Sequence, residues 1–552
     1  MSDAPSEWSQ LQFERDFVRS LPGADAGAPH LPRATPGACH AAAVPEPAAD
    51  PDLRAWRCEL ATDMGLPPVG SASRAAVAAL FAGNTAVAHG QPYAMRYGGH
   101  QFGNWADQLG DGRVINLGEW RASADRVWTV QLKGAGRTPY SRGADGRAVL
   151  RSSIREFVAS EAMHALGIPT SRALALVTTG MPVERDMLYD GNPRLEPGAV
   201  VTRVAPSFVR LGNFEIHAAH QEHEALRALH DYCLARHFPD CAGDTAAFFA
   251  EVCRRTAELM AGWMSVGFVH AVMNTDNLSI LGHTIDYGPF AWMEDFDPAW
   301  TPNEVDRGRR YGFGRQPQMA QWNLARFGSA LLPLGVSVET LEPVLAAFGP
   351  QYSAAFQRRM VAKLGLRSVT AETTALLDPL FAGMAEYRLD MTLFFRGLAD
   401  CVREAASAAD RARFITLVSA LAATPDMPEA LADASHPLQQ WWGQWRELRL
   451  REAGEAGVDA ATASGRETAE SLRRWCAQRA EAMDRCNPAI VPRNWRLADV
   501  ITAAEAGDWS PFDTLLEQVT HPFVGRVDDL LGERPPADAA SRPGCGRLTC
   551  SS

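Results

Sequence analysis

Hydrophobic and polar positions alternate along several short segments in the first half of the chain. In residues 126–133, Trp128, Val130 and Leu132 share one face, and Val127, Thr129, Gln131 and Lys133 share the other. A period of two predicts a strand, and residues 113–120 show the same texture. Residues 174–178 and 199–203 also read as strands. We therefore expect an antiparallel sheet in this part of the chain.

A helical pattern follows the first two of these segments. An apolar stripe runs from Ile154 to Leu166, and Gly167 predicts its end. Ser153 and Glu156 have the spacing of a capping box at the start of this helix.

From about Glu215 onward the pattern is mostly helical. The predicted helices cover residues 217–237, 246–267 and 322–327, then long stretches through 340–450 and 453–482. A small sheet with a tight turn is expected at 278–285.

A β-rich region with one helix therefore precedes a helix-rich region, which predicts an α+β fold. The Ala-, Pro- and Gly-rich residues 23–52 predict an irregular arm, and the tail from Arg534 is expected to be flexible. The expected segments are an N-terminal arm (1–75), a β-rich lobe (76–214), a helical lobe (215–450) and a helical extension with a tail (451–552).

The composition is typical of a soluble globular protein, with 46% hydrophobic and 21% charged residues in 552. The formal net charge of −12 does not favour a nucleic-acid partner. The start of the chain has no signal-peptide pattern, and no apolar run has the length of a membrane span. We therefore expect a cytoplasmic protein without a membrane partner. The ten cysteines form no C-x-x-C pair, which argues against a zinc cluster or a disulfide framework.

The segment from His270 to Asn277, followed by Asp286-Tyr-Gly288, has the spacing of a protein-kinase catalytic core. Kinases carry H-R-D-x-x-x-x-N and then D-F-G. The position of the kinase base holds Val272, which cannot accept a proton. The chain is therefore either inactive or performs different chemistry with a nucleotide and Mg²⁺.

Other residues complete a candidate site around this motif. Asn277 and Asp286 are oxygen ligands of the kind that Mg²⁺ prefers. Asp276 is the best remaining candidate for a general base, with a role in orienting metal-bound water as the alternative. Lys133 at a strand end and Glu156 on the next helix have the order of the kinase Lys–Glu pair. Each residue alone is equally typical of a structural role, but together they favour the ion pair.

Three further groups suit phosphate binding. Gly110-Asp-Gly112-Arg113 and residues 141–147, which include Asp145 and Gly146, are glycine-rich and contain arginines. Arg203 and Arg210 suit bidentate phosphate contacts. Plain turns and surface ion pairs are the alternatives, and spacing does not decide between them.

These segments resemble the selenoprotein O family (SelO, also called YdiU), kinase-like proteins that act as protein adenylyltransferases. The similarity runs from about residue 75 to the end. It is carried by Y-G-G-H-Q-F-G (97–103), Q-L-G-D-G-R (108–113), Q-L-K-G-A-G (131–136), T-P-Y-S-R (138–142), G-R-A-V-L-R-S-S-I-R-E (146–156), G-I-P-T (167–170), G-N-F-E (212–215), M-N-T-D-N (273–277) and the pairs 487–488 and 493–494.

The resemblance implies a protein-kinase-like two-lobe fold with a flipped ATP, so that the α-phosphate faces the acceptor. It implies that Lys133, Arg203 and Arg210 hold the β- and γ-phosphates and that Glu156 positions Lys133. The other implied roles are nucleotide contacts for Gly110, Gly112, Arg113, Asp145 and Gly146, metal binding for Asn277 and Asp286, and proton acceptance for Asp276.

The implied reaction is transfer of AMP from ATP to Ser, Thr or Tyr hydroxyls of proteins, with Mg²⁺ or Mn²⁺. UMP transfer from UTP with Mn²⁺, ordinary kinase activity and a non-catalytic nucleotide-binding scaffold are the alternatives. Val272 argues against the kinase, and the complete metal site argues against the scaffold. Many eukaryotic members carry selenocysteine where this chain has Cys550, which makes a redox role as plausible as an ordinary exposed thiol. A monomer is expected.

Overall fold

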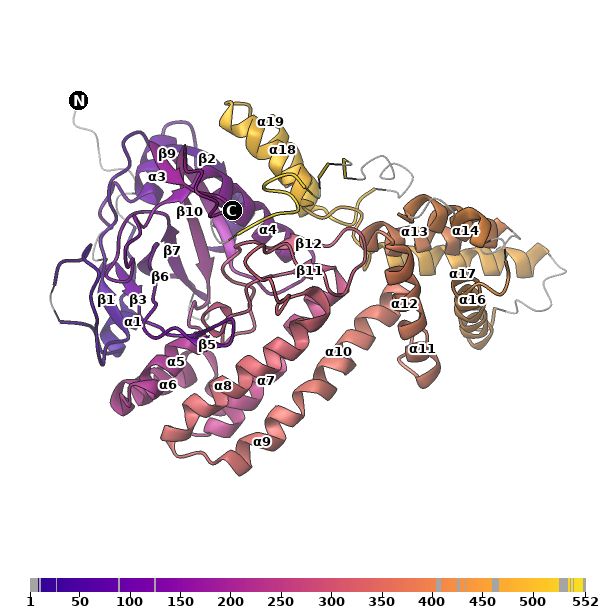
Figure 1. The fold of residues 1–552 in the computed structure, drawn as a ribbon, viewed down its shortest axis with the longest axis horizontal. Coiled ribbons are helices and arrows are strands. Elements are labelled where there is room, and N and C mark those ends of the chain that lie inside the picture. The colour runs from indigo at the N-terminus through magenta and orange to yellow at the C-terminus, as the bar shows by residue number, and fades with distance from the viewer. Residues whose placement is uncertain are drawn as a thin grey trace.

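A computed structural model of the chain combines an antiparallel sheet with many helices (Figure 1). It describes residues 8, 11–25, 27–87, 90–123, 126–403, 409–423, 427–431, 433–458, 466–525, 535–536, 538–539 and 541–549. The strands of the sheet, in spatial order, are β1 (His40–Ala42), β3 (Tyr93–Met95), β6 (Val114–Ser123), β7 (Arg126–Lys133), β10 (Arg194–Ala205), β9 (Arg172–Arg185) and β2 (Asp52–Trp56), with β8 (Ala148–Val149) paired to β10. The expected class, an antiparallel sheet with many helices, is confirmed.

The four segments predicted from their hydrophobic patterns are strands of this sheet. β7 lies between β6 and β10, with Lys133 opposite Val114 and Val201. Val130 and Leu132 of β7 pack in one hydrophobic core on one face of the sheet. Gln131 and Lys133 therefore lie on the other face, as the alternation predicted.

The expectation of an irregular arm at 23–52 is wrong for its pairing segments. β1 pairs with β3, and β2 pairs with β9, so both edges of the sheet come from the first 56 residues. The sequence pattern missed them because β1 has three residues and follows a Pro- and Gly-rich segment.

Helices cover both faces of the sheet. α3 (Arg74–Ala82) packs against β2, β9 and β10, and α4 (Leu150–Ala165) packs against β9 and β10 from the other side. The predicted capping box at Ser153 is wrong, because α4 begins at Leu150 and the Ser153 hydroxyl donates to the Val149 carbonyl at 2.9 Å. Glu156 is therefore free to reach across to the sheet.

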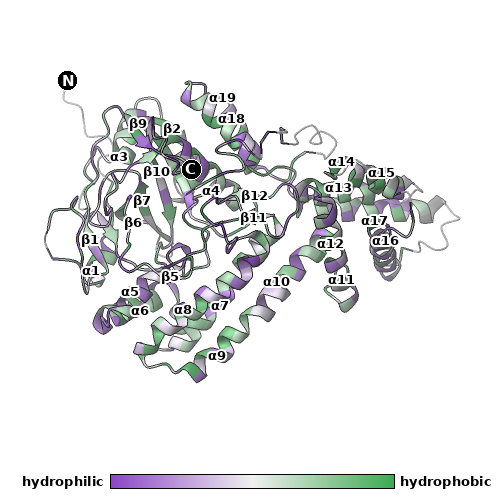
Figure 2. Cartoon of the chain, in the orientation of Figure 1, coloured by the Kyte–Doolittle hydropathy of each residue, from purple (hydrophilic) through white to green (hydrophobic). Residues whose placement is uncertain are grey.

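The helices after β10 form the rest of the fold. The single helix predicted over 217–237 is two helices in the structure, α5 (Leu211–Ala219) and α6 (His223–His237), because the chain turns at Gln221 (φ +58°). In Figure 2, α7, α8 and α10 carry both hydrophobic and hydrophilic residues, as expected for helices with one buried side. The helices are α5 (Leu211–Ala219), α6 (His223–His237), α7 (Thr245–Ser265), α8 (Gln316–Leu331), α9 (Val338–Ala346), α10 (Phe348–Lys363), α11 (Ala371–Ala375), α12 (Leu377–Tyr387), α13 (Met391–Arg403), α14 (Ala409–Leu421), α15 (Met427–Ala430), α16 (Pro437–Glu455), α17 (Arg466–Asp484), α18 (Asn494–Glu505) and α19 (Ser510–Thr520), with α1 (Asp16–Ser20) and α2 (Cys58–Asp63) before the sheet.

The segment with the kinase-like spacing lies between α7 and α8. β11 (Phe268–Val269) pairs with β12 (Ala291–Trp292), and a 3-10 turn covers Thr275–Asn277. The small sheet expected at 278–285 is a turn closed by one bridge between Leu278 and Thr284. Asp286 follows this turn directly, two residues after Thr284.

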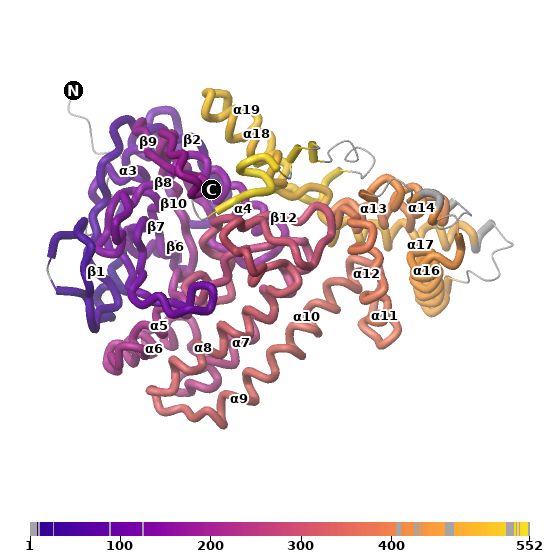
Figure 3. The backbone as a smooth tube through the Cα atoms, viewed as in Figure 1, coloured from indigo at the N-terminus to yellow at the C-terminus, as the bar shows by residue number. Residues whose placement is uncertain are grey.

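The end of the described chain returns to the middle of the molecule. α18 and α19 pack against α4, and the C-terminal segment lies beside α4 and β12 (Figure 3). The Leu548 N–H donates to the Pro302 carbonyl at 3.0 Å, so this part of the predicted flexible tail contacts the loop before α8. Cys550 lies outside the described residues. Within the described ranges, no helix combines the length and apolar character needed to cross a bilayer.

Candidate active site

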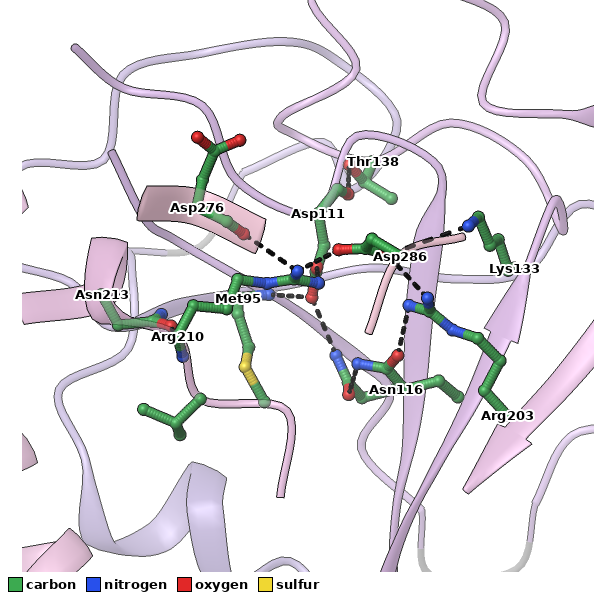
Figure 4. Close-up of polar contacts among 12 residues, drawn as sticks. Met95, Asp111, Asn116, Lys133, Thr138, Arg203, Arg210, Asn213, Asp276 and Asp286 are labelled. Atoms are coloured by element: carbon green, nitrogen blue, oxygen red, sulfur yellow. Dashed lines mark hydrogen bonds and ion pairs between the residues drawn. The ribbon is translucent and has the colours of Figure 1, made fainter. Parts of the chain in front are cut away.

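Three cations from the sheet and the adjoining loop surround the carboxylate of Asp286 (Figure 4). Lys133 on β7 lies 3.8 Å and Arg203 on β10 lies 2.6 Å from Oδ1, and Arg210 contacts Oδ2. On the other side, Glu156 of α4 binds Lys133 at 2.6 Å and Arg203 at 3.0 Å. The five residues that the sequence predicted for this cluster therefore lie together.

The charges of this cluster shift one another's ionisation. Burial alone raises the pKa of Asp286, but Arg210, Arg203 and Lys133 outweigh it and hold that pKa well below its usual range. Burial lowers the pKa of Lys133 to about 8, against the opposite effect of Glu156. Asp286 also has a left-handed backbone (φ +55°), which is uncommon outside glycine and fixes the direction of its carboxylate.

A chain of buried hydrogen bonds runs from Arg203 through two amide side chains to Asp111, and the sequence patterns did not predict it. Arg203 donates to Gln131 at 2.7 Å, Gln131 donates to Asn116 at 2.8 Å, and Asn116 donates to Asp111 at 3.2 Å. Arg210 lies 3.6 Å from the Asp111 carboxylate. A polar residue within an apolar strand, such as Asn116 in β6, could have indicated a buried hydrogen bond.

Asp276 lies on the opposite side of Arg210 from Asp286. Its backbone carbonyl accepts from Arg210 at 3.1 Å, whereas its carboxylate points away from the cationic cluster (Figure 4). Gln101, in the hairpin of β4 (His100–Gln101) and β5 (Asn104–Trp105), donates to Oδ2 at 3.2 Å. Oδ1 is buried and has no hydrogen-bond partner. The hairpin is a second part of the site that the sequence did not predict.

The hairpin approaches Asp276 closely. A Cβ at Gly99 would come within 2.5 Å of Oδ1, so only glycine allows this approach. Burial raises the pKa of Asp276 to about 6, against a smaller lowering effect of the Gln101 hydrogen bond. The carboxylate is therefore mostly ionised at neutral pH and has a free lone pair.

Asn277 and Asp286 fit a divalent ion by the chemistry of their donors. The Asn277 side-chain N–H₂ donates to the Val272 carbonyl at 2.9 Å, which leaves Oδ1 as the available acceptor. Amide and carboxylate oxygens are ligands that Mg²⁺ and Mn²⁺ accept, usually completed by water and substrate phosphates. Across the described ranges, no group of three or more His, Cys, Asp or Glu side chains forms a separate metal site.

The glycine-rich residues 110–113 lie at the start of β6, next to Lys133. Gly110 has φ +92°, and a Cβ there would meet the Tyr140 ring at 2.4 Å. The Ser141 hydroxyl donates to the Gly112 carbonyl. Arg113 is half-buried and has no ion pair with any described carboxylate, so its guanidinium is a candidate for binding an anion.

Asp145 and Gly146 already have structural partners. Arg185 donates to both oxygens of Asp145, at 2.7 and 2.8 Å, and the Gly146 carbonyl accepts from Gly136 at 3.2 Å. Burial alone raises the pKa of Asp145, but the Arg185 hydrogen bonds lower it below the usual value. A nucleotide contact at Asp145 therefore has to compete with, or share, this ion pair.

Comparison with known proteins identifies the family. Residues 34–520 match the family model described as "Protein adenylyltransferase SelO". The chain is 46% identical to a protein of Nitrosospira multiformis (98% of this chain, 96% of the relative) and to one of Xanthomonas campestris pv. campestris (99% and 100%). It is 45% identical to one of Azoarcus sp. (98% and 99%), and all three relatives are named "Protein nucleotidyltransferase YdiU". The chain therefore belongs to the SelO family and is an enzyme of the protein nucleotidyltransferase class.

Proposed function

We propose that this protein transfers AMP from ATP to Ser, Thr or Tyr hydroxyls of other proteins and releases pyrophosphate. The observation that carries the proposal is the separation of two carboxylates by Arg210. Asp286 faces three cations, and Asp276 presents an unpartnered oxygen on the other side. A cationic cluster suits a triphosphate, and a free carboxylate suits a hydroxyl proton.

In this proposal Lys133, Arg203 and Arg210 hold the β- and γ-phosphates. Their positive charge stabilises the negative charge that develops on the leaving pyrophosphate. Glu156 keeps the Lys133 ammonium in position through the 2.6 Å contact. The remaining nucleotide contacts come from Gly110, Gly112, Arg113, Asp145 and Gly146.

The acceptor hydroxyl lies on the Asp276 side. Its oxygen attacks the α-phosphorus, the bond from that phosphorus to the bridging oxygen breaks, and the hydroxyl proton moves to the Asp276 carboxylate. Asn277 and Asp286 would hold Mg²⁺ or Mn²⁺, and the bound ion would neutralise phosphate charge. Val272 lies where a kinase has its base, so this chain has no such group beside a γ-phosphate acceptor.

We also propose a protein-kinase-like two-lobe fold with the segments 76–214, 215–450 and 451–552. The Lys133–Glu156 contact and the spacing of His270, Asn277 and Asp286 support it. The strands β1 and β2 favour adding much of residues 1–75 to the first lobe. A cytoplasmic monomer remains our expectation.

Transfer of UMP from UTP with Mn²⁺ is the alternative reaction. The names of the relatives specify nucleotidyl transfer without a base, whereas the family description specifies adenylyl transfer. ATP and UTP carry the same triphosphate, so the cationic cluster around Asp286 does not discriminate between the two nucleotides.

The test is a label-transfer assay on the purified protein with Mg²⁺ or Mn²⁺. α-³²P-ATP, γ-³²P-ATP and α-³²P-UTP are compared in parallel on a mixture of acceptor proteins. Labelling by α-³²P-ATP and not by γ-³²P-ATP is expected. Labelling only by γ-³²P-ATP would show a kinase, stronger labelling by UTP would show uridylyl transfer, and nucleotide binding without any transfer would show a scaffold.

A further inference from the structure

A cluster of arginines lies beside the hairpin that contacts Asp276. Four of them are exposed and one is half-buried, and all come from the loop before α8 or from α8 itself. We call this set the arginine face: Arg307, Arg309, Arg310, Arg315 and Arg326.

The arginine face has no carboxylate partners. None of its members forms an ion pair with a described Asp or Glu, although the chain as a whole carries a net charge of −12. Two acidic residues lie close to these arginines in the chain. Glu304 forms an ion pair with Arg547 at 3.0 Å, and Asp306 is buried. Its two oxygens accept the backbone N–H groups of Arg310 and Tyr311 at 2.9 and 2.8 Å. Both acidic side chains therefore have partners other than the guanidinium groups of these arginines. Arg315 donates to the Gly308 and Arg309 carbonyls at 3.2 and 3.4 Å, and none of the five guanidinium groups has a carboxylate partner among the described residues.

The arginine face adjoins the Asp276 side of the site. The guanidinium of Arg310 lies 3.4 Å from where a Cβ of Gly103 would be, and Gly103 belongs to the turn of the β4–β5 hairpin. The Phe102 N–H in the same turn donates to the Tyr311 hydroxyl at 3.0 Å. Gln101, one residue earlier, donates to Asp276. One short hairpin thus joins the proposed proton acceptor to the arginines.

Aromatic rings line the same surface. The Arg310 and Arg326 guanidinium groups lie 4.8 and 5.2 Å from the Trp322 ring, and His100 packs 5.4 Å from that ring. Trp105 at the other side of His100 is 37% exposed. Unpaired arginines next to partly exposed aromatic rings are typical of protein-binding surfaces.

We propose that the arginine face is the docking surface for the acceptor protein and that it selects acidic segments beside the modified hydroxyl. This inference rests on the proposed function, because it places the acceptor on the Asp276 side. Glutamate, aspartate or phosphate groups of the acceptor would occupy the unpaired guanidinium groups. Exposed charges of this kind govern encounter rate and specificity, so the selection weakens as salt rises.

The test uses two peptide series that differ only in the residues flanking one acceptor hydroxyl, with glutamates in one and lysines in the other. Wild-type protein is expected to modify the glutamate series with a kcat/KM at least about tenfold higher at low salt. Arg309→Glu/Arg326→Glu is expected to remove or reverse this preference with an unchanged KM for the nucleotide. The matched control is Arg474→Glu on α17, an exposed arginine at the far end of the molecule, which should retain the preference (Figure 1).

Equal kcat/KM for the two series, or equal loss in the control and the double variant, would overturn the inference. Binding of fluorescein-labelled peptides, followed by anisotropy, separates it from the proposed function. If no peptide is modified but the glutamate peptide still binds and the double variant loses that binding, transfer fails and docking stands. Tighter binding of a single-stranded oligonucleotide than of a glutamate peptide with equal charge would instead identify a nucleic-acid surface.

Discussion

Asp286 and Asp276 lie on opposite sides of Arg210, and their surroundings differ. Asp286 is held by three cations, whereas Asp276 has one hydrogen-bonded oxygen and one free oxygen. Burial acts on both carboxylates in the same direction, so the opposite shifts of their pKa values come from the number of cations nearby. The surroundings of Asp286 therefore keep its charge fixed, whereas those of Asp276 suit a group that accepts a proton.

Removing the charge of Asp286 should have the largest effect on the difference between the two carboxylates. In Asp286→Asn, Arg203 and Arg210 lose their shared counter-ion and the proposed metal loses a ligand. We expect label transfer from α-³²P-ATP to fall by at least about 10³-fold. Near-normal transfer by the folded variant would contradict the assignment of this site. Unpaired buried charges also destabilise a protein, so circular dichroism at matched concentration is the control for loss of fold.

Asp276→Asn tests the other side. The variant keeps the shape of the side chain and the contact with Gln101 but has no basic oxygen. We expect kcat to fall by about 10²- to 10⁴-fold, with a nucleotide Kd within about twofold of wild type. Gln101→Ala is the matched control, since it removes the hydrogen bond and leaves the carboxylate. An equal loss of nucleotide binding in Asp276→Asn would contradict the division of roles.

Asn277→Ala is expected to have a smaller effect that depends on metal concentration. The substitution removes one proposed oxygen ligand and leaves the Asp286 carboxylate in place. The Mg²⁺ or Mn²⁺ concentration for half-maximal transfer should rise by about tenfold, and activity should recover at high metal. A titration in which activity stays low at every metal concentration would argue against a ligand role.

Glu119 is a buried carboxylate outside the site, and its substitution should leave nucleotide transfer almost unchanged. Burial raises the pKa of Glu119 to about 7, and its oxygens accept from the Tyr93 hydroxyl at 3.1 Å and the Asp16 N–H at 2.9 Å. Between pH 4.5 and 7 the folded state keeps a proton that the unfolded state releases. The contribution of Glu119 to the free energy of unfolding is therefore full below pH 4.5 and falls as the pH rises through 7.

Glu119→Gln removes this titration. The difference in thermal midpoint between variant and wild type should become more favourable to the variant from pH 5 to pH 8. A difference that stays constant over this range would show that Glu119 does not titrate there. Label transfer at constant pH serves as the control, because a change in transfer would link Glu119 to the site.

The sequence could predict much of the β-rich region and most of the cluster around Asp286. β6, β7, β9, β10 and α4 follow from patterns that each span fewer than twenty residues. Lys133, Glu156 and Asp286 were identified because their order and spacing match the kinase arrangement, whereas the role of Arg203 came from the resemblance to the family. The capping-box prediction for Ser153 was wrong because that rule considers only four consecutive residues. It does not include Lys133, which is distant in the chain and forms an ion pair with Glu156.

The sequence alone shows which segments alternate between hydrophobic and polar residues, which residues carry charge, and that residues 270–288 have kinase-like spacing. The three-dimensional structure adds that β1 and β2 form the two edges of the sheet, that Gln101 contacts Asp276, and that the arginine face lies beside the hairpin. These contacts join residues from 51 to 207 positions apart, from Ala42 and Tyr93 in the sheet to Gly103 and Arg310. Periodicity and spacing report only on near neighbours in the chain, whereas the packing of the whole molecule sets such contacts.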